Sequence, residues 1–274
     1  MPICGKKRFA TQNLKPEPLL IPSAEPFLFL GQPDRPAVLL IHGFTSSPKE
    51  VRWMGEYLHA QGFTCLGVRL SGHATRPEDM IRSRYIDWMA SVEDGYHLLR
   101  GLASRIFLAG ISTGGALALL MSTRLDVQGV VAISTLDGLP KDYPFWLLKA
   151  ASLVMPYSAK TNQAPGASWY DKEAFKTHVA YPANPVRSVA ELKLLLAEMN
   201  AALPNVRVPV LLVHSRDDKY VRPESMPRIH ARVGSSEKEM FWVTESGHVV
   251  TRDAKRAEVF AAASAFIQRV ESNK

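Results

Sequence analysis

Hydrophobic positions along the chain follow two alternating periods. Short, largely apolar runs, typical of strands buried on both faces of a sheet, occur at residues 37–42, 64–70, 105–110, 129–134, 208–214 and 239–243. Between them, apolar residues recur at helical spacing over residues 47–61, 85–102, 113–124, 223–233 and 252–271. This alternation predicts an α/β fold with a mostly parallel sheet, flanked by helices and joined by right-handed crossovers.

The alternation stops between residues 137 and 205. This segment is rich in aromatic residues and prolines, has one helical pattern at 189–203, and contains no run typical of a strand. It predicts a small helical cap inserted into one core, whose two parts are residues 27–136 and 206–274. Residues 1–26 are rich in proline and aperiodic, and we expect an N-terminal arm there.

Composition narrows the class of protein. The chain has 274 residues, of which 46% are hydrophobic, enough for one large α/β domain with an insertion. The net charge of +7 is spread along the chain, and the one short basic run is Lys6-Lys7-Arg8 near the terminus. Because no basic helix face or aromatic-plus-basic platform occurs, the sequence does not favour nucleic acid as a partner.

Cysteine content and hydropathy bear on the compartment. The two cysteines, Cys4 and Cys65, do not suggest a disulfide framework. The N-terminal sequence has no apolar segment of the kind found in secretion signals, and no run of eighteen apolar residues occurs. We therefore expect a cytoplasmic protein with no stable membrane anchoring.

The strand expected at 105–110 runs directly into the helix expected at 113–124 through Gly110-Ile111-Ser112-Thr113-Gly114. This sequence fits the G-x-S-x-G pattern, in which a sharp strand-to-helix turn exposes a nucleophilic serine. Serine is also a favoured helix N-cap residue, so the motif alone leaves both interpretations open.

A nucleophilic serine needs a histidine base and an acid, which in this architecture follow it in the order acid, then histidine. Asp217 and Asp218 follow the strand at 208–214, and His248 follows the strand at 239–243. Asp218 is the favoured acid because it begins a run that leads into the next helix, and Asp217 is expected to cap the turn. Asp137, which follows the strand at 129–134, is a weaker alternative.

Acyl transfer also needs hydrogen-bond donors for the oxyanion. We expect these to be the main-chain N–H groups of Thr113, next to the serine, and of Phe44, in the loop after the first buried strand. His42 is expected to brace that loop, His73 to shape a neighbouring one, and His214 to be packed or hydrogen-bonded. No metal-ligand spacing or nucleotide-binding motif occurs, so no metal or cofactor is expected.

Several motifs together resemble the α/β-hydrolase family, in its bacterial carboxylesterase and monoacylglycerol-lipase branch: LLIHGFTSSP, RLSGHATRPEDM, DWMASVEDGYHLL, LAGISTGG, RDDKYVRP and ESGHVVTRD. The resemblance runs from about Phe27 to the C-terminus. It implies Ser112 as nucleophile, Asp218 as acid, His248 as base, and the N–H groups of Phe44 and Thr113 as the oxyanion hole. It also implies a small helical cap.

The resemblance breaks at one informative position. In the monoacylglycerol-lipase branch, a glutamate that helps to bind glycerol follows the tyrosine matching Tyr181, whereas this chain has Pro182. The expected function is therefore a serine carboxylesterase that cleaves short-to-medium-chain acyl esters of small molecules. A monoacylglycerol lipase, or a thioesterase or lactonase using the same residues, is the alternative.

Overall fold

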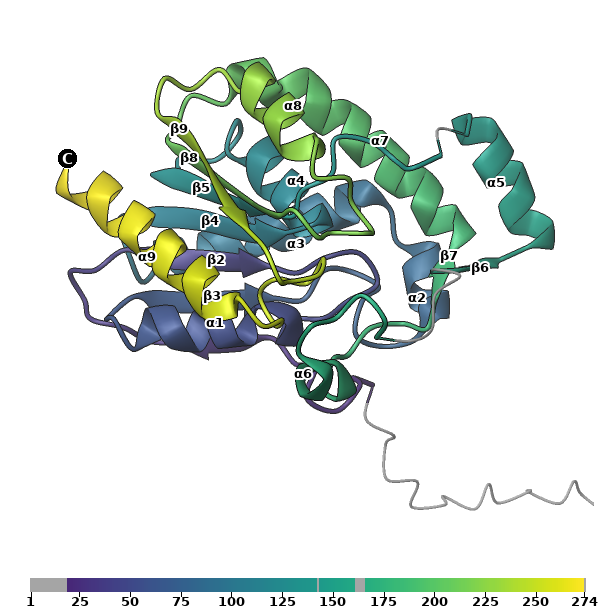
Figure 1. Cartoon of the computed structure of the whole chain (residues 1–274), viewed down its shortest axis with the longest axis horizontal. Helices are drawn as coiled ribbons and strands as arrows, with labels where there is room; N and C mark the ends of the chain where they lie inside the picture. Colours follow the sequence, from purple (N-terminus) through teal and green to yellow (C-terminus); the bar gives the residue numbers. More distant parts are fainter. Residues whose placement is uncertain (1–18, 142, 161–165, 274) are drawn as a thin grey trace, which may run out of the picture.

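The computed structural model describes residues 19–141, 143–160 and 166–273. Residues 1–18 of the expected arm, with Cys4 and the basic run, lie outside the described part. The main sheet has seven strands in the order β1-β3-β2-β4-β5-β8-β9. Figure 1 shows its twist. The strands are β1 (Phe27–Phe29), β2 (Ala37–Ile41), β3 (Thr64–Val68), β4 (Ile106–Ile111), β5 (Gly129–Ile133), β8 (Val210–Ser215) and β9 (Lys238–Val243).

All neighbouring strands of this sheet are parallel except β1, which pairs antiparallel with β3 at the edge. The mostly parallel sheet predicted from the apolar runs is thereby confirmed. The sequence did not predict β1, because three residues are too few to show a period. The parallel direction brings the carboxyl ends of β4, β8 and β9 to one edge of the sheet, where ligands of such folds bind.

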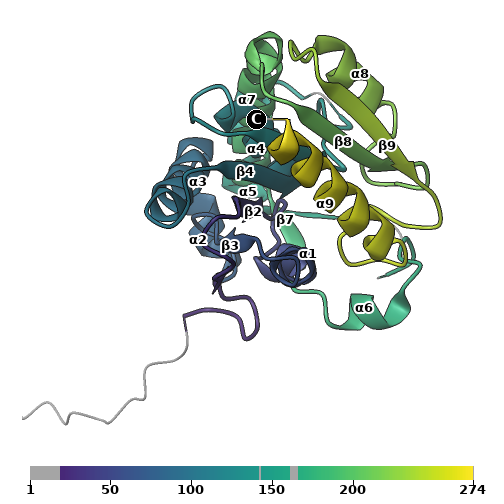
Figure 2. The same ribbon diagram turned by 90° about the vertical axis from the view of Figure 1, so that its left-hand side faces the viewer.

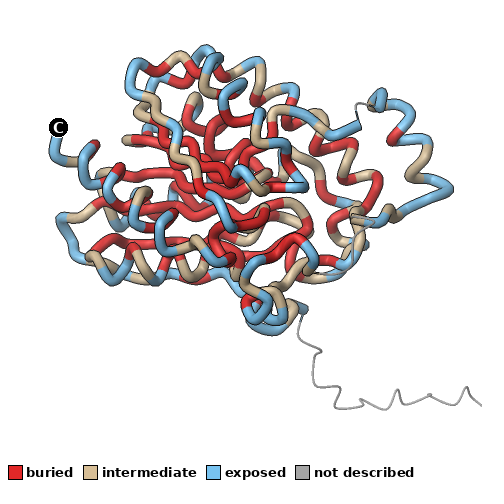
Figure 3. The backbone as a smooth tube through the Cα atoms, in the orientation of Figure 1, coloured by how far each residue is buried: buried red, intermediate tan, exposed pale blue. Residues whose placement is uncertain are grey.

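Helices cover both faces of the sheet, as Figure 2 shows. Successive strand residues point to opposite faces, so that Leu39 and Ile41 pack on one side while Val38 and Leu40 pack on the other. The first side is covered by α3 (Tyr85–Arg100), α4 (Thr113–Met121), α7 (Val186–Ala202) and α8 (Ser225–Arg232), and the second by α1 (Lys49–His59) and α9 (Arg256–Ser272). The two buried layers form the continuous interior in Figure 3.

The segment 137–205 contains more structure than the single predicted helix. Besides α7 it holds α5 (Phe145–Val154), α6 (Lys172–Lys176), the short 3-10 turn η1 (Leu203–Asn205), and two strands, β6 (Tyr157–Ala159) and β7 (Ala183–Pro185), which pair antiparallel. The expectation of no strand there was wrong, because strands of three residues leave no alternating pattern. α7 packs on α4 and shares its hydrophobic core, whereas α5 packs on α7.

Two further helix predictions needed correction. The short helix α2 (Pro77–Arg82) was not predicted, and the last helix begins at Arg256 rather than at residue 252. Arg252 and Asp253 are almost fully buried and bind loop atoms instead of extending the helix. Cys65 is buried and carries a free thiol, and burial raises its pKa to about 12. Among the described helices, none combines the length and apolar character needed to cross a membrane.

Candidate active site

Ser112 lies at the turn between β4 and α4 in a conformation that side chains rarely adopt. Its φ is 56° and its ψ is −118°, and its N–H donates to the Ile133 carbonyl at 2.8 Å. The Ser112 side chain makes no capping hydrogen bond to the helix that follows. The main chain therefore begins the helix, and the half-buried hydroxyl is left available for other contacts.

Two glycines allow this turn to close. A Cβ atom added to Gly110 would lie 2.1 Å from the Gly114 carbonyl oxygen, and one added to Gly114 would lie 2.1 Å from the Ile41 carbonyl oxygen. Both distances are impossible for real atoms in contact. The G-x-S-x-G pattern thus has a steric cause: the strand and the helix pass so closely that only glycine fits beside the serine.

Asp218 and His248 meet at the same edge of the sheet. Asp218 follows β8, His248 follows β9, and the His248 Nδ1 atom donates to Asp218 Oδ2 at 2.7 Å. The other carboxylate oxygen, Oδ1, accepts the N–H groups of Tyr220 and Val221 at 2.8 and 2.9 Å. The carboxylate is therefore fixed in place, and its bond to Nδ1 leaves Nε2 of the imidazole as the atom that can accept a proton.

His214 contacts the same carboxylate, with its Nε2 atom 3.2 Å from Asp218 Oδ2. Burial by itself would raise the pKa of Asp218, but the adjacent His248 and the hydrogen bonds from His214, His248 and the Val221 N–H together hold it well below its usual range. Burial lowers the pKa of His248, but Asp218 and Glu50 outweigh it, so that this pKa is raised. The pair is thus an ionised carboxylate beside an imidazole with enhanced basicity.

The two alternative acids lie elsewhere. Asp217 accepts the Glu245 N–H at 2.7 Å, which braces the loop that carries His248. Asp137 accepts the Ser225 hydroxyl at 2.6 Å and lies 3.4 Å from Arg228. Of the three aspartates considered from the sequence, Asp218 is therefore the one that contacts the imidazole.

The loop after β2 lies directly against the nucleophile position. A Cβ added to Gly43 would lie 3.3 Å from the Ser112 Cβ, so the peptide that leads to Phe44 passes beside the serine. The Ser46 N–H closes a turn on the Gly43 carbonyl at 3.2 Å, with Thr45 at a φ of 58°. Thr113 is the first residue of α4, where main-chain N–H groups have no partner inside the helix. The loop after β2 and the start of α4 thus both lie beside Ser112.

Comparison with known proteins shows the family of this chain. Residues 32–255 match the family model described as serine aminopeptidase, S33 (Hydrolase_4). The chain belongs to this α/β-hydrolase family.

Relatives within the family are ester-cleaving enzymes by name. The chain is 33% identical to a thermostable monoacylglycerol lipase from Bacillus sp. (strain H-257), over 85% of this chain and 90% of that protein. It is 28% identical to a carboxylesterase from Bacillus subtilis (strain 168), over 90% of this chain and 97% of that protein. A solved structure from work on the metagenome-derived lipolytic enzymes LipS and LipT superposes with a TM-score of 0.79 at 29% identity, covering 91% and 99% of the two chains.

In this α/β-hydrolase, two of the other histidines, His42 and His73, lie buried beside the site. His42 accepts the Leu70 N–H at 3.2 Å and donates to the Gly43 carbonyl at 2.9 Å, so both ring nitrogens are used. Burial and the neighbouring His73 hold the pKa of His42 well below its usual range, and burial lowers that of His73 to about 4. Both side chains shape the loops beside the site and are poor candidates for the base.

Sequence reasoning missed one group at this site. Glu50 accepts the Gly43 N–H and is 5% exposed. The available signal was its spacing in the predicted helix, because Glu50 precedes Met54 and Leu58 by four and eight residues and so shares their buried face. The contact of His214 with the acid had no such signal, since the sequence predicted only that this histidine is packed or hydrogen-bonded.

Segment 137–205 contacts the loop after β2 through Tyr181. The Tyr181 N–H donates to the Thr45 carbonyl at 2.8 Å, and its hydroxyl donates to the Gly72 carbonyl at 2.8 Å. The next residue, Pro182, is exposed and has no polar side chain that could bind a glycerol hydroxyl.

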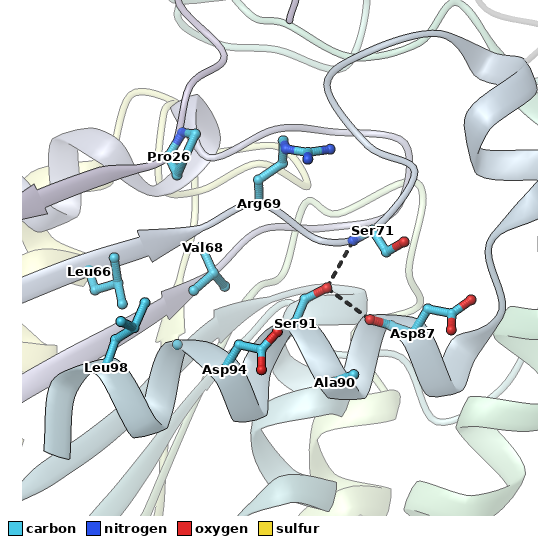
Figure 4. Close-up of a pocket in the computed structure, with 11 residues that line it drawn as sticks. Pro26, Leu66, Val68, Arg69, Ser71, Asp87, Ala90, Ser91, Asp94 and Leu98 are labelled. Atoms are coloured by element: carbon cyan, nitrogen blue, oxygen red, sulfur yellow. Dashed lines mark hydrogen bonds between the residues drawn. The ribbon is translucent and has the colours of Figure 1, made fainter. Parts of the chain in front are cut away.

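A separate groove of about 560 Å³ lies between β3 and α3, away from these residues. Figure 4 shows that Leu66 and Val68 of β3 and Leu98 of α3 form its apolar side. Asp87 and Asp94, also on α3, line the groove as well. None of the candidate catalytic residues lines it. Among the residues that the structure describes, no group of three or more histidine, cysteine or acidic side chains is arranged to hold a metal ion.

Proposed function

We propose that this protein is a serine carboxylesterase that hydrolyses short-to-medium-chain acyl esters through an acyl-enzyme on Ser112. The observation that carries the proposal is the Asp218–His248 contact at 2.7 Å, at the strand edge where Ser112 occupies a strained turn. The family membership and the names of the relatives support ester hydrolysis as the reaction.

In the proposed mechanism, the Ser112 hydroxyl attacks the ester carbonyl carbon while His248 Nε2 accepts its proton. Asp218 holds the imidazole through Nδ1 and stabilises the imidazolium that forms. The imidazolium then donates its proton to the leaving alcohol, and an acyl-enzyme remains. Water activated by the same imidazole attacks the acyl-enzyme and releases the acid.

The main-chain N–H groups of Phe44 and Thr113 are the proposed donors to the tetrahedral oxyanion. Gly43 lets this main chain pass close to Ser112, and the start of α4 favours negative charge near Thr113. The hydrogen bonds from such donors strengthen as negative charge develops on the oxygen, and each contributes about 3 kcal/mol of transition-state stabilisation.

Monoacylglycerol hydrolysis is the second candidate, favoured by the relative at 33% identity. We place it second because Pro182 stands where that branch has its glycerol-binding glutamate. We also propose that the segment 137–205 is the cap that forms part of the acyl-binding site, because Tyr181 joins it to the loop after β2, residues 42–45, which we name the oxyanion loop.

Turnover of p-nitrophenyl esters from C2 to C16 tests the proposal directly. We expect an optimum near C4–C8, and loss of turnover to background in Ser112→Ala. Activity that survives in Ser112→Ala, or no activity across the series, would refute the esterase. A clear preference for monoacylglycerols over these esters would favour the second candidate.

The choice of acid is tested by three matched substitutions: Asp218→Asn, Asp217→Asn and Asp137→Asn. We expect Asp218→Asn to lower kcat by about 10⁴-fold, because the wrong imidazole tautomer is then held. The other two variants should stay within a few-fold of wild type. Near wild-type turnover in Asp218→Asn would show that another acid serves His248.

A further inference from the structure

Glu50 is a buried acid outside the proposed triad. It lies in the first turn of α1, is 5% exposed, and shares the buried face of the helix with Val51, Met54 and Leu58. Burying a carboxylate is costly unless it is hydrogen-bonded and paired with charge. A glutamate among apolar residues therefore needs a specific reason, and its contacts supply one.

The first contact is with the oxyanion loop. The Gly43 N–H donates to Glu50 Oε2 at 2.6 Å, a short hydrogen bond strengthened by the charge on the carboxylate. A Cβ added to Gly43 would lie 3.1 Å from this same oxygen and 3.3 Å from the Ser112 Cβ. Gly43 is thus held between the carboxylate and the nucleophile, and the Phe44 N–H is the next main-chain donor.

The second link is with the segment that follows His248. The Thr251 hydroxyl donates to the Glu50 carbonyl at 2.8 Å, and the Arg252 guanidinium donates to the Lys49 carbonyl at 3.1 Å. The first turn of α1 is therefore hydrogen-bonded to the oxyanion loop on one side and to the segment that follows His248 on the other.

The charged groups around Glu50 come from two parts of the chain. His248 and Arg252 lie on the C-terminal segment, and Lys160 follows β6; each interacts electrostatically with the Glu50 carboxylate. His178 faces the same cations and His248, and burial keeps it neutral by lowering its pKa to about 3. Burial raises the pKa of Glu50 above its ordinary value, although the Gly43 N–H, His248 and Lys160 act in the opposite direction and favour the charged form.

We propose that Glu50 is a positioning residue of this site, whose carboxylate anchors the oxyanion loop through Gly43 and supplies a second negative charge to His248. The proposal rests on the esterase function proposed above. As His248 becomes an imidazolium during acylation, Asp218 and Glu50 both stabilise the new charge. Glu50 thus acts on two features that the transition state needs: the order of the oxyanion loop and the basicity of the imidazole.

Two substitutions separate these effects. Glu50→Gln keeps an oxygen that accepts the Gly43 N–H but removes the charge, whereas Glu50→Ala removes both. Glu56→Gln is the matched control, because Glu56 lies on the same helix but is exposed and paired with Arg52. The readouts are kcat and KM as a function of pH, the unfolding midpoint, and the NMR titration of the His248 imidazole.

For Glu50→Gln we expect the acid limb of kcat/KM and the His248 pKa to move to lower pH, by about half a unit or more. For Glu50→Ala we expect in addition a fall in kcat of about 10²-fold with little change in KM, because the oxyanion loop is displaced. Glu56→Gln should leave every readout at the wild-type value.

The proposal is overturned if Glu50→Gln changes only the unfolding midpoint and leaves the acid limb and the His248 titration unchanged, since a purely structural carboxylate would do so. The His248 titration, carried out in a Ser112→Ala background, does not depend on turnover. If the wild type fails to cleave esters, the proposed function fails, while this titration still decides whether Glu50 acts on His248.

Discussion

Two helices of almost equal apolar character have opposite environments in this molecule. In α4, with the sequence TGGALALLM, all nine residues are buried, whereas in α5, with the sequence FWLLKAASLV, Leu148 alone is. α4 packs among β2, β4, β5, α3 and α7, while α5 packs on the outer side, against α7. Figure 3 shows the same contrast, with α5 projecting at the upper right.

The difference shows that apolar content alone does not decide burial. α4 follows a central strand and must return over the sheet, so its side chains face other elements on every side. α5 lies in the segment 137–205 and packs chiefly against α7, and Leu153 and Val154 are 85% and 87% exposed.

The largest expected effect on stability comes from creating a cavity beside α4. Leu117→Ala removes a fully buried side chain from the largest core layer, and should lower the free energy of unfolding by about 2–5 kcal/mol. Urea unfolding followed by circular dichroism measures this. A loss below about 1 kcal/mol would mean that α4 is not held as tightly as its burial indicates.

The turn before α4 gives the next largest effect. Gly114→Ala places a Cβ against the Ile41 carbonyl, and we expect about 1–3 kcal/mol of destabilisation together with a fall in ester turnover of about 10²-fold. Gly138→Ala is the control, because an added Cβ there meets no atom within 4 Å. Equal behaviour of the two variants would contradict the steric account of the motif.

The pH dependence of kcat/KM tests the environment of His248, the proposed base for the serine that precedes α4. The pKa of His248 is raised above its ordinary value of 6.5, chiefly by Asp218 acting against burial. Because the base must be unprotonated, kcat/KM should fall about tenfold per pH unit below a midpoint that lies above 6.5. A midpoint below that value in the wild type would show that burial outweighs Asp218.

Stability should depend on pH through the same pair. The lowered pKa of Asp218 stabilises the fold above the unfolded-state pKa, and this contribution is lost as the pH falls through the folded-state pKa. The raised pKa of His248 stabilises the fold below its unfolded-state value, and this contribution is lost as the pH rises through the folded-state pKa. Measuring the free energy of unfolding of wild type and Asp218→Asn as a function of pH tests the contributions of Asp218 and His248.

The smallest effect is expected in α5. Leu153→Ala is chemically the same change as Leu117→Ala, yet it should alter the free energy of unfolding by less than about 0.5 kcal/mol, because the side chain is already in solvent. The same urea titration serves as the measurement. A loss above about 1 kcal/mol would show that something covers α5 in solution.

Prediction from the sequence succeeded where local chemistry and chain direction suffice. The apolar runs predicted the parallel strands, and Gly110 and Gly114 predicted a tight turn at Ser112 that the structure contains. The order of Asp218 and His248 at successive strand ends predicted their meeting, since parallel strands bring those ends to one edge. Short elements such as β1, β6 and β7 were not predictable, because three residues carry no period.

By itself, the sequence determined the fold class, the strained serine turn and the meeting of Asp218 with His248 at successive strand ends, because these follow from periodicity and from the direction of parallel strands. The tertiary structure alone decided that His214 shares the Asp218 carboxylate and that Glu50 holds Gly43. It also decided that α4 is buried and α5 exposed. These outcomes depend on distances between segments far apart in the chain, which no local pattern records.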